Sequence, residues 1–184
     1  MATIKHWMTW QDGVDLVALT DPKLKSPNII IHLANIVKTP VGNAPSGMIL
    51  WQPDPNSMPA IIAFVSTDKD VGKYFGPKIF AGTPFEQVQV FKALINIQLH
   101  GNKAISRCEV NGYVFEVEMS GFSAPYLINR PPAANSPFWQ QGIEMSSSTT
   151  VLKVNDRVID MVVPPIGITG GPASVVAPHG LYAR

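Results

Sequence analysis

The chain has 184 residues, of which 46% are hydrophobic and 15% are charged. This length and hydrophobic content suffice to bury the core of one domain, which excludes a disordered chain. The formal net charge is +1 and no cluster of basic residues occurs, so the electrostatic footprint of a nucleic-acid-binding protein is missing. We therefore expect no nucleic-acid partner.

The first residues do not resemble a secretory signal, because Lys5, His6 and Asp12 interrupt any apolar core. No stretch of the sequence approaches the roughly 18 consecutive apolar residues of a transmembrane helix. The sequence thus predicts a soluble protein that is cytoplasmic as synthesised, with release only by a non-classical route.

The first half of the chain is divided into short apolar runs by many of the 17 Pro and 14 Gly residues, which is typical of sandwiches and barrels. The run 28–37 is apolar on both faces, which predicts a central strand with His32 buried or half-buried. The runs 47–52 and 60–66 predict two more strands, joined by a long loop.

Two short helices are expected next. The segment 66–76 offers Thr67 as the N-cap, acidic residues in the first turn and Gly76 at the C′ position. The segment 84–91 follows a Thr-Pro start and is expected to form one or two helical turns.

The segment 93–100 alternates strictly between apolar and polar residues, which favours a strand over a continuing helix. We expect it to pair with 104–110 across a Gly-Asn turn. Next, Asn111 and Gly112 supply the positive-φ pair of a type I′ turn. The register of that hairpin pairs Val110 with Tyr113, Cys108 with Phe115, Arg107 with Glu116 and Ser106 with Val117.

A second hairpin is predicted with its turn at Asn155 and Asp156. Its core side is expected to hold Leu152, Ile159, Met161 and Val163. Together these patterns predict a mainly β fold, an antiparallel β-sandwich or flattened barrel of about ten short strands with one or two short helices. We expect one β-rich domain over 1–163, followed by a C-terminal arm over 164–184.

The sequence contains no motif for catalysis or cofactor binding, so no cofactor and no metal site are predicted. Cys108 is the single cysteine, and we interpret it as a buried small apolar residue. One acid–base constellation can be drawn, with His32 or His100 beside Asp160 or Glu118. The catalytic residues otherwise stay unknown.

The segment 122–142 is interpreted as a long loop that gathers aromatic and amide side chains. Such rings suit a sugar or an apolar ligand, although they equally fill the end of a sandwich core. The candidate ligand-binding residues are Tyr126, Arg130, Phe138, Trp139, Gln140 and Gln141.

The arm 164–184 has no acidic residue and is rich in Gly and Pro, yet it carries enough apolar residues to pack on the domain or on a neighbouring subunit. The residues expected to pack are Ile166, Ile168, Val175, Val176, Leu181 and Tyr182.

Two classes of function remain. The first is a non-catalytic protein that self-associates into a homo-oligomer, in one version as a membrane-active or toxin-like component acting at a membrane surface. The alternative is a small-ligand- or carbohydrate-binding module, or an enzyme without a recognisable motif, that uses the segment 122–142.

Overall fold

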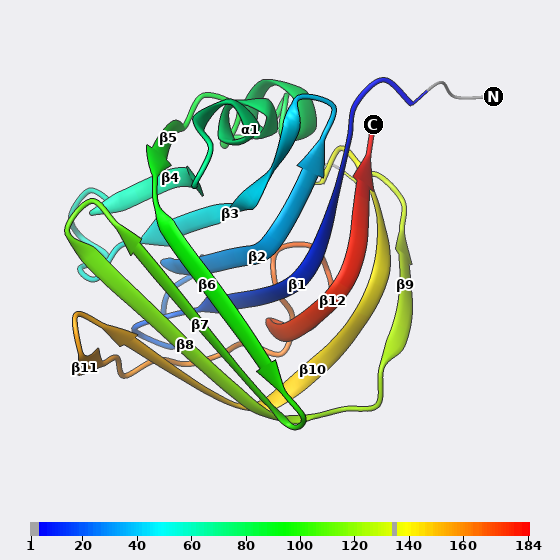
Figure 1. Cartoon of the computed structure of the whole chain (residues 1–184). Coiled ribbons are helices and arrows are strands. Elements are labelled where there is room, and N and C mark those ends of the chain that lie inside the picture. The colour runs from blue at the N-terminus through cyan, green and yellow to red at the C-terminus, as the bar shows by residue number, and fades with distance from the viewer. Residues whose placement is uncertain (1–3, 134–135) are drawn as a thin grey trace.

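The computed structural model describes residues 4–133 and 136–184. These residues form a single curled sheet with a short helical segment lying against one face (Figure 1). The fold is mainly β, as the sequence predicts, and the curled sheet has the outline of a half-barrel. In chain order its strands are β1 (Trp7–Ala18), β2 (Ile29–Thr39), β3 (Gly42–Trp51), β4 (Ile61–Ser66), β5 (Gln89–Lys92), β6 (Leu94–His100), β7 (Lys103–Val110), β8 (Tyr113–Phe122), β9 (Tyr126–Arg130), β10 (Trp139–Val154), β11 (Arg157–Val158) and β12 (Ser174–Ala183).

The strand order is β5-β4-β3-β2-β1-β12-β10-β8-β7-β6, with β9 and β11 pairing with β10 outside this path. All pairs are antiparallel except β4 with β5. The two strands that end the path, β5 and β6, are consecutive in the chain and are separated only by Ala93. The segment 89–100 therefore connects one edge of the curled sheet to the other.

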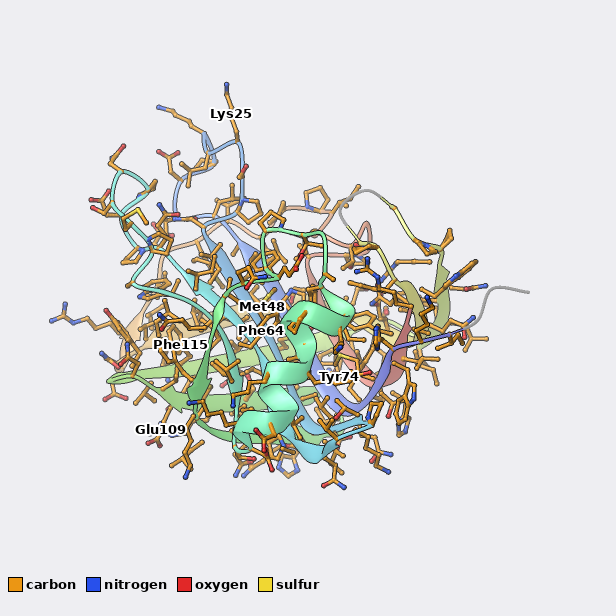
Figure 2. All side chains as sticks on the ribbon, turned by 90° about the horizontal axis from the view of Figure 1, so that it is seen from above. Lys25, Met48, Phe64, Tyr74, Glu109 and Phe115 are labelled. Atoms are coloured by element: carbon orange, nitrogen blue, oxygen red, sulfur yellow. The ribbon has the colours of Figure 1, made fainter. Side chains whose placement is uncertain are left out.

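Strands β1 to β4 carry an apolar core on each face. One core lies between these strands and β6 to β8, and it includes Leu16, Ile31 and Phe115. The other includes Met48 and Phe64 together with residues of the helical segment, and Figure 2 labels both residues next to the helix. This two-sided burial explains why 28–37 is apolar on both faces, and the prediction of a central strand is confirmed.

The helical segment consists of α1 (Lys69–Tyr74), continued by a π-helix, η1 (Phe75–Ile79). The predicted caps were wrong. Asp68 is the N-cap instead of Thr67, because its carboxylate accepts hydrogen bonds from the backbone N–H groups of Asp70 and Val71. Gly76 lies inside η1, where a side chain would collide with the carbonyl oxygen of Glu86.

The helical turns predicted for 84–91 are absent from the structure. Residues 84–87 form turns, and the chain then enters β5, which pairs in parallel with β4. The β-branched Val90 is the cross-strand partner of Phe64 in the pairing of β5 with β4. In a strand of four residues, this pairing outweighs the local helical signals.

The two hairpins predicted between 93 and 122 are confirmed. Strand β6 pairs with β7, and β7 pairs with β8 in the predicted register, with Arg107 opposite Glu116. The positive φ angles of Asn111 and Gly112 fit the predicted turn. Cys108 is completely buried, as expected, and burial raises the pKa of its thiol to about 12.

The remaining predictions for the second half of the chain were partly right. The turn at Asn155 and Asp156 is confirmed, but its second strand, β11, has only two residues. The segment 122–142 is not a single loop, because 126–130 pairs with β10 as strand β9 and β10 itself begins at Trp139. Residues 134 and 135 of that segment lie outside the described residues.

The C-terminal segment supplies strand β12, which lies between β1 and β10 of the same chain. Of the residues assigned to an arm, Val175 and Val176 are buried there and Tyr182 is 9% exposed. Ile166 is 64% exposed in the segment before β12. The division of the chain at residue 163 stays a prediction.

Candidate functional site

A change in side-chain alternation within β1 creates the site. On a regular strand, residues an odd number apart point to opposite faces, yet Trp10 and Asp15 line the same cavity. The alternation changes at Asp12, which has a φ of +53°. The pairing of β1 with β2 and β12 keeps its register across Asp12. The Asp-Gly dipeptide formed with Gly13 was the sequence signal for this irregularity, because Asp tolerates positive φ.

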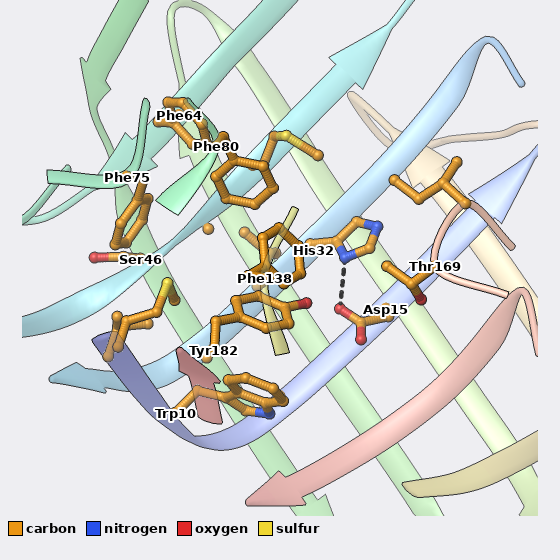
Figure 3. Close-up of a pocket in the computed structure, with 18 residues that line it drawn as sticks. Trp10, Asp15, His32, Ser46, Phe64, Phe75, Phe80, Phe138, Thr169 and Tyr182 are labelled. Carbon is orange, nitrogen blue, oxygen red and sulfur yellow. Dashed lines mark ion pairs between the residues drawn. The ribbon is translucent and has the colours of Figure 1, made fainter. Parts of the chain in front are cut away.

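The cavity lies between the sheet and the helical segment, and we call it the inner chamber (Figure 3). Its volume is about 70 Å³, roughly half that of an apolar cavity of ~150 Å³ that binds benzene. It can hold only a small molecule or the end of a larger one. The residues most important for its chemistry are Trp10, Asp15, His32, Phe80, Phe138 and Tyr182.

Two of the polar residues in the inner chamber form a pair. His32 on β2 is the cross-strand partner of Asp15 on β1, and the imidazole Nδ1 lies 2.9 Å from a carboxylate oxygen of Asp15. Because an ionised carboxylate only accepts hydrogen bonds, Nδ1 carries a proton, and in the neutral ring Nε2 is an acceptor. Nε2 is buried and has no hydrogen-bond partner among the described residues.

Tyr182 on β12 brings a hydroxyl group to the same chamber. Burial and the negative charges of Asp15 and Glu144 raise the pKa of this phenol far above its usual value, so the hydroxyl stays protonated. Within the described part of the chain the hydroxyl makes no hydrogen bond. Figure 3 shows it directed toward the region of His32 and Asp15.

The described lining of the chamber includes three residues with a hydroxyl group, Ser46, Thr169 and Tyr182. Ser46 is the one serine in its lining, and its hydroxyl lies 2.8 Å from the hydroxyl of Ser66, so that it is already engaged. Lysine and cysteine are absent from the described lining residues. The His32–Asp15 pair can bind a polar group or exchange a proton.

A second cavity of about 320 Å³ adjoins the first, and we call it the outer chamber. Phe138, Ile168 and Thr169 line both cavities, so the two chambers meet at these three side chains. Arg130 and Gln140 supply the polar side of the outer chamber.

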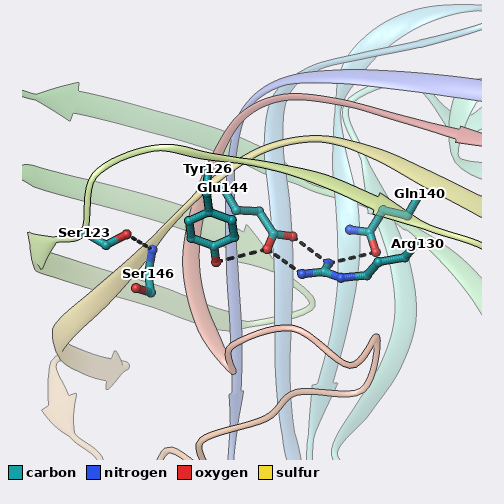
Figure 4. A network of polar contacts seen from close by, with 6 residues as sticks. All are labelled: Ser123, Tyr126, Arg130, Gln140, Glu144 and Ser146. Carbon is teal, nitrogen blue, oxygen red and sulfur yellow. Dashed lines mark hydrogen bonds and ion pairs between the residues drawn. The ribbon is translucent and has the colours of Figure 1, made fainter.

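Arg130 belongs to a buried polar network (Figure 4). Its guanidinium makes two hydrogen bonds to the carboxylate of Glu144, at 2.8 and 2.7 Å, and donates a third to the side-chain oxygen of Gln140 at 3.1 Å. Tyr126 donates a longer bond, at 3.3 Å, to Glu144. Burial lowers the pKa of Arg130, but the bonds and charge of Glu144 outweigh it and raise that pKa overall.

The structure separates the six residues that the sequence proposed for ligand binding. Phe138 lines both chambers, and Arg130 and Gln140 line the outer one. Tyr126 contacts the network through Glu144, whereas Trp139 is 44% exposed outside both chambers. Gln141 faces an open groove on another part of the sheet.

The predicted acid–base constellation was wrong in its partners. His32 pairs with Asp15, whereas His100 contacts Gln98. Glu118 forms an ion pair with Lys103 at 2.7 Å. Asp15 had not been proposed from the sequence, because its contact with His32 depends on the register of β1 against β2.

No three His, Cys, Asp or Glu side chains among residues 4–133 and 136–184 are placed to hold a metal ion. In the same part of the chain, no helix combines the length and the apolar character needed to cross a membrane.

Comparisons with known proteins give a distant likeness in structure. No family model matches the chain, and no curated protein matches it. The crystal structure of acetoacetate decarboxylase from Legionella pneumophila is similar over 100% of this chain and 88% of its own, with 8% sequence identity and a TM-score of 0.40. The likeness is to the fold at a distance, and neither an activity nor a residue role is transferred from it.

Proposed function

We propose that this protein binds a small, mainly apolar molecule that carries a hydroxyl group, and that the inner chamber is its site. The observation that carries this proposal is the buried Nε2 of His32, which has no described partner in a mainly apolar cavity. Leaving a buried acceptor without a hydrogen bond costs about 1 to 3 kcal/mol. A ligand hydroxyl that donates to Nε2 would remove this cost.

The surroundings of His32 favour a neutral ligand. Asp15 fixes the orientation of the imidazole, and the protonated hydroxyl of Tyr182 adds a second group that can donate or accept. The aromatic rings of Phe80 and Phe138 contribute apolar surface. We propose binding in preference to catalysis, because the feature that points to a ligand is a free hydrogen-bonding atom, Nε2 of His32.

The replacement His32→Asn is expected to weaken alcohol binding while leaving the chamber in place. Asn keeps an N–H near the position of Nδ1, where it can donate to Asp15, but it has no atom at the position of Nε2. Binding of 2-methyl-1-propanol, followed by NMR chemical-shift changes, is expected to weaken about tenfold, which corresponds to one hydrogen bond at the upper end of its usual range.

Xenon provides the test of the cavity itself, since it occupies apolar cavities without hydrogen bonds. It should bind to the wild type and to His32→Asn alike. The matched control is His179→Asn, because His179 is exposed on β12 and lies outside the inner chamber. Equal alcohol affinity in the wild type and His32→Asn, with xenon bound in both, would contradict the proposal.

Self-association stays a second proposal, supported by apolar side chains on strands with a free edge. Leu127 on β9 is 85% exposed, and β9 pairs only with β10 among the described strands. Unprotected edges of this kind are sites where further chains add. The membrane-active version stays a prediction that a vesicle-leakage assay would test.

Replacing Leu127 with Lys is expected to reduce any oligomer to the monomer, because a charged side chain on an edge strand opposes the addition of another chain. Light scattering on a sizing column measures the mass of both proteins at the same concentration. An oligomer of unchanged mass in the variant would exclude β9 as the contact.

A further inference from the structure

We infer that the outer chamber is a second subsite for the same ligand, and that it receives a neutral hydrogen-bond acceptor such as an amide or ester carbonyl. This inference rests on the proposed function and specifies the chemistry of the ligand at its other end. The ligand is then an elongated molecule with a hydroxyl group in the inner chamber and a carbonyl group in the outer one.

The first observation is an unused donor. Gln140 is only 3% exposed, and its side-chain oxygen accepts the hydrogen bond from Arg130, which fixes the orientation of the amide. The amide nitrogen on the other side has no acceptor among the described residues. Because Gln140 lines the outer chamber, its free amide N–H can donate to a ligand atom there.

The second observation concerns charge. The positive charge of Arg130 is already balanced by the two hydrogen bonds to Glu144, which is 2% exposed. The outer chamber therefore presents donor groups without a net charge to neutralise. A neutral carbonyl oxygen fits this environment better than an ammonium group or a carboxylate, because the desolvation of either charge would lack a free counter-charge there.

The third observation is that the chambers adjoin. Phe138, Ile168 and Thr169 line both of them, so these side chains lie between the chamber that holds His32 and the chamber that holds Gln140. The inner chamber is too small for more than the end of such a molecule, whereas the outer chamber of about 320 Å³ has room for the rest.

The test uses a homologous series of ω-hydroxyalkanamides, from hydroxybutanamide to hydroxyoctanamide, each compared with the 1-alkanol and the ω-aminoalkanol of the same length. We expect an optimum chain length at which the amide binds about three- to tenfold more tightly than the alkanol, and the aminoalkanol more weakly than both. Binding is measured by NMR titration and by the fluorescence of Trp10, which lines the inner chamber.

The variant Gln140→Met removes the donor at nearly constant side-chain length, and it is expected to remove the advantage of the amide while 1-alkanols bind as before. The matched control is Gln141→Met, the same change at the next residue, which is exposed and faces away from both chambers. Should Gln140→Met fold poorly, Gln140→Glu replaces the donor by an acceptor and is expected to reverse the order of amide and aminoalkanol.

The two proposals fail in different ways. If amides of every length bind no better than alkanols, or if Gln140→Met keeps the amide's advantage, the outer subsite is refuted while alcohol binding at His32 still stands. If alkanols bind equally well to the wild type and His32→Asn, the proposed function itself is refuted.

Discussion

Replacement of Glu144 with Gln is expected to lower the free energy of unfolding by about 3 to 5 kcal/mol. The carboxylate of Glu144 is 2% exposed and accepts two hydrogen bonds from Arg130. Gln keeps one acceptor but turns an N–H toward the guanidinium, and it leaves the charge of Arg130 in a largely buried site without a counter-charge. Urea denaturation followed by Trp fluorescence measures the change.

The control for this variant is Glu109→Gln. Glu109 also pairs with an arginine, Arg107, but both side chains are more than 40% exposed and the pair is screened by water. We expect little change in the urea midpoint for this variant. A similarly small change for Glu144→Gln would mean that Arg130 reaches solvent and that the network of Figure 4 contributes little to stability.

The substitution Gly47→Ala is expected to destabilise the fold by about 3 kcal/mol, at the upper end of the range for overpacking. A Cβ atom at Gly47 would collide with the backbone carbonyl of His32 and lie 2.9 Å from the Cα atom of Leu33. Because backbone atoms of β2 cannot rotate away, β2 and β3 must separate. The shift would also displace the imidazole of His32, so alcohol affinity should fall together with stability.

The comparison variant is Gly82→Ala. Gly82 has a φ of +81° and no atom within 4 Å of the added Cβ, so its replacement measures backbone strain without collision. Alanine in this conformation costs about 1 to 2 kcal/mol. Thermal denaturation measures the loss of stability in both variants. If Gly47→Ala loses no more stability than Gly82→Ala, β2 and β3 accommodate the added methyl group and the predicted collision is wrong.

Local patterns in the sequence predicted much of the sheet. The Asn111-Gly112 turn determined the register of β7 and β8, because its geometry and the alternation on either side allow one pairing. The central position of β2 followed from apolar residues on both faces. Information of this kind lies within about ten residues of the element concerned.

Elements that depend on distant partners were not predicted. β9 and the first part of β10 were interpreted as a loop, because Pro and aromatic residues obscure the alternation of apolar and polar residues. Each of these two strands is stabilised by its pairing with the other, which the sequence of either one does not reveal. The helical interpretation of 84–91 failed for the same reason, since β5 is stabilised by β4. In both segments, pairing with a strand that is distant in the sequence outweighs the local preference for a loop or a helix.

The candidate site was less predictable than the fold. Phe138, Arg130 and Gln140 were identified by composition alone, and the structure places all three in the lining of the outer chamber. Asp15 was missed, although it makes the decisive contact with His32. The carboxylate and the imidazole come from different strands, and no spacing in the sequence encodes their register.

The position of β12 between β1 and β10 has a consequence for biosynthesis. Trp7 pairs with Ala183, so one edge of β1 has no partner until β12 leaves the ribosome. Pairings of such long sequence separation form slowly, and an open edge strand is prone to aggregation in the meantime. Folding of the sheet should therefore be completed only after β12 has been synthesised, and it should benefit from a chaperone that covers β1.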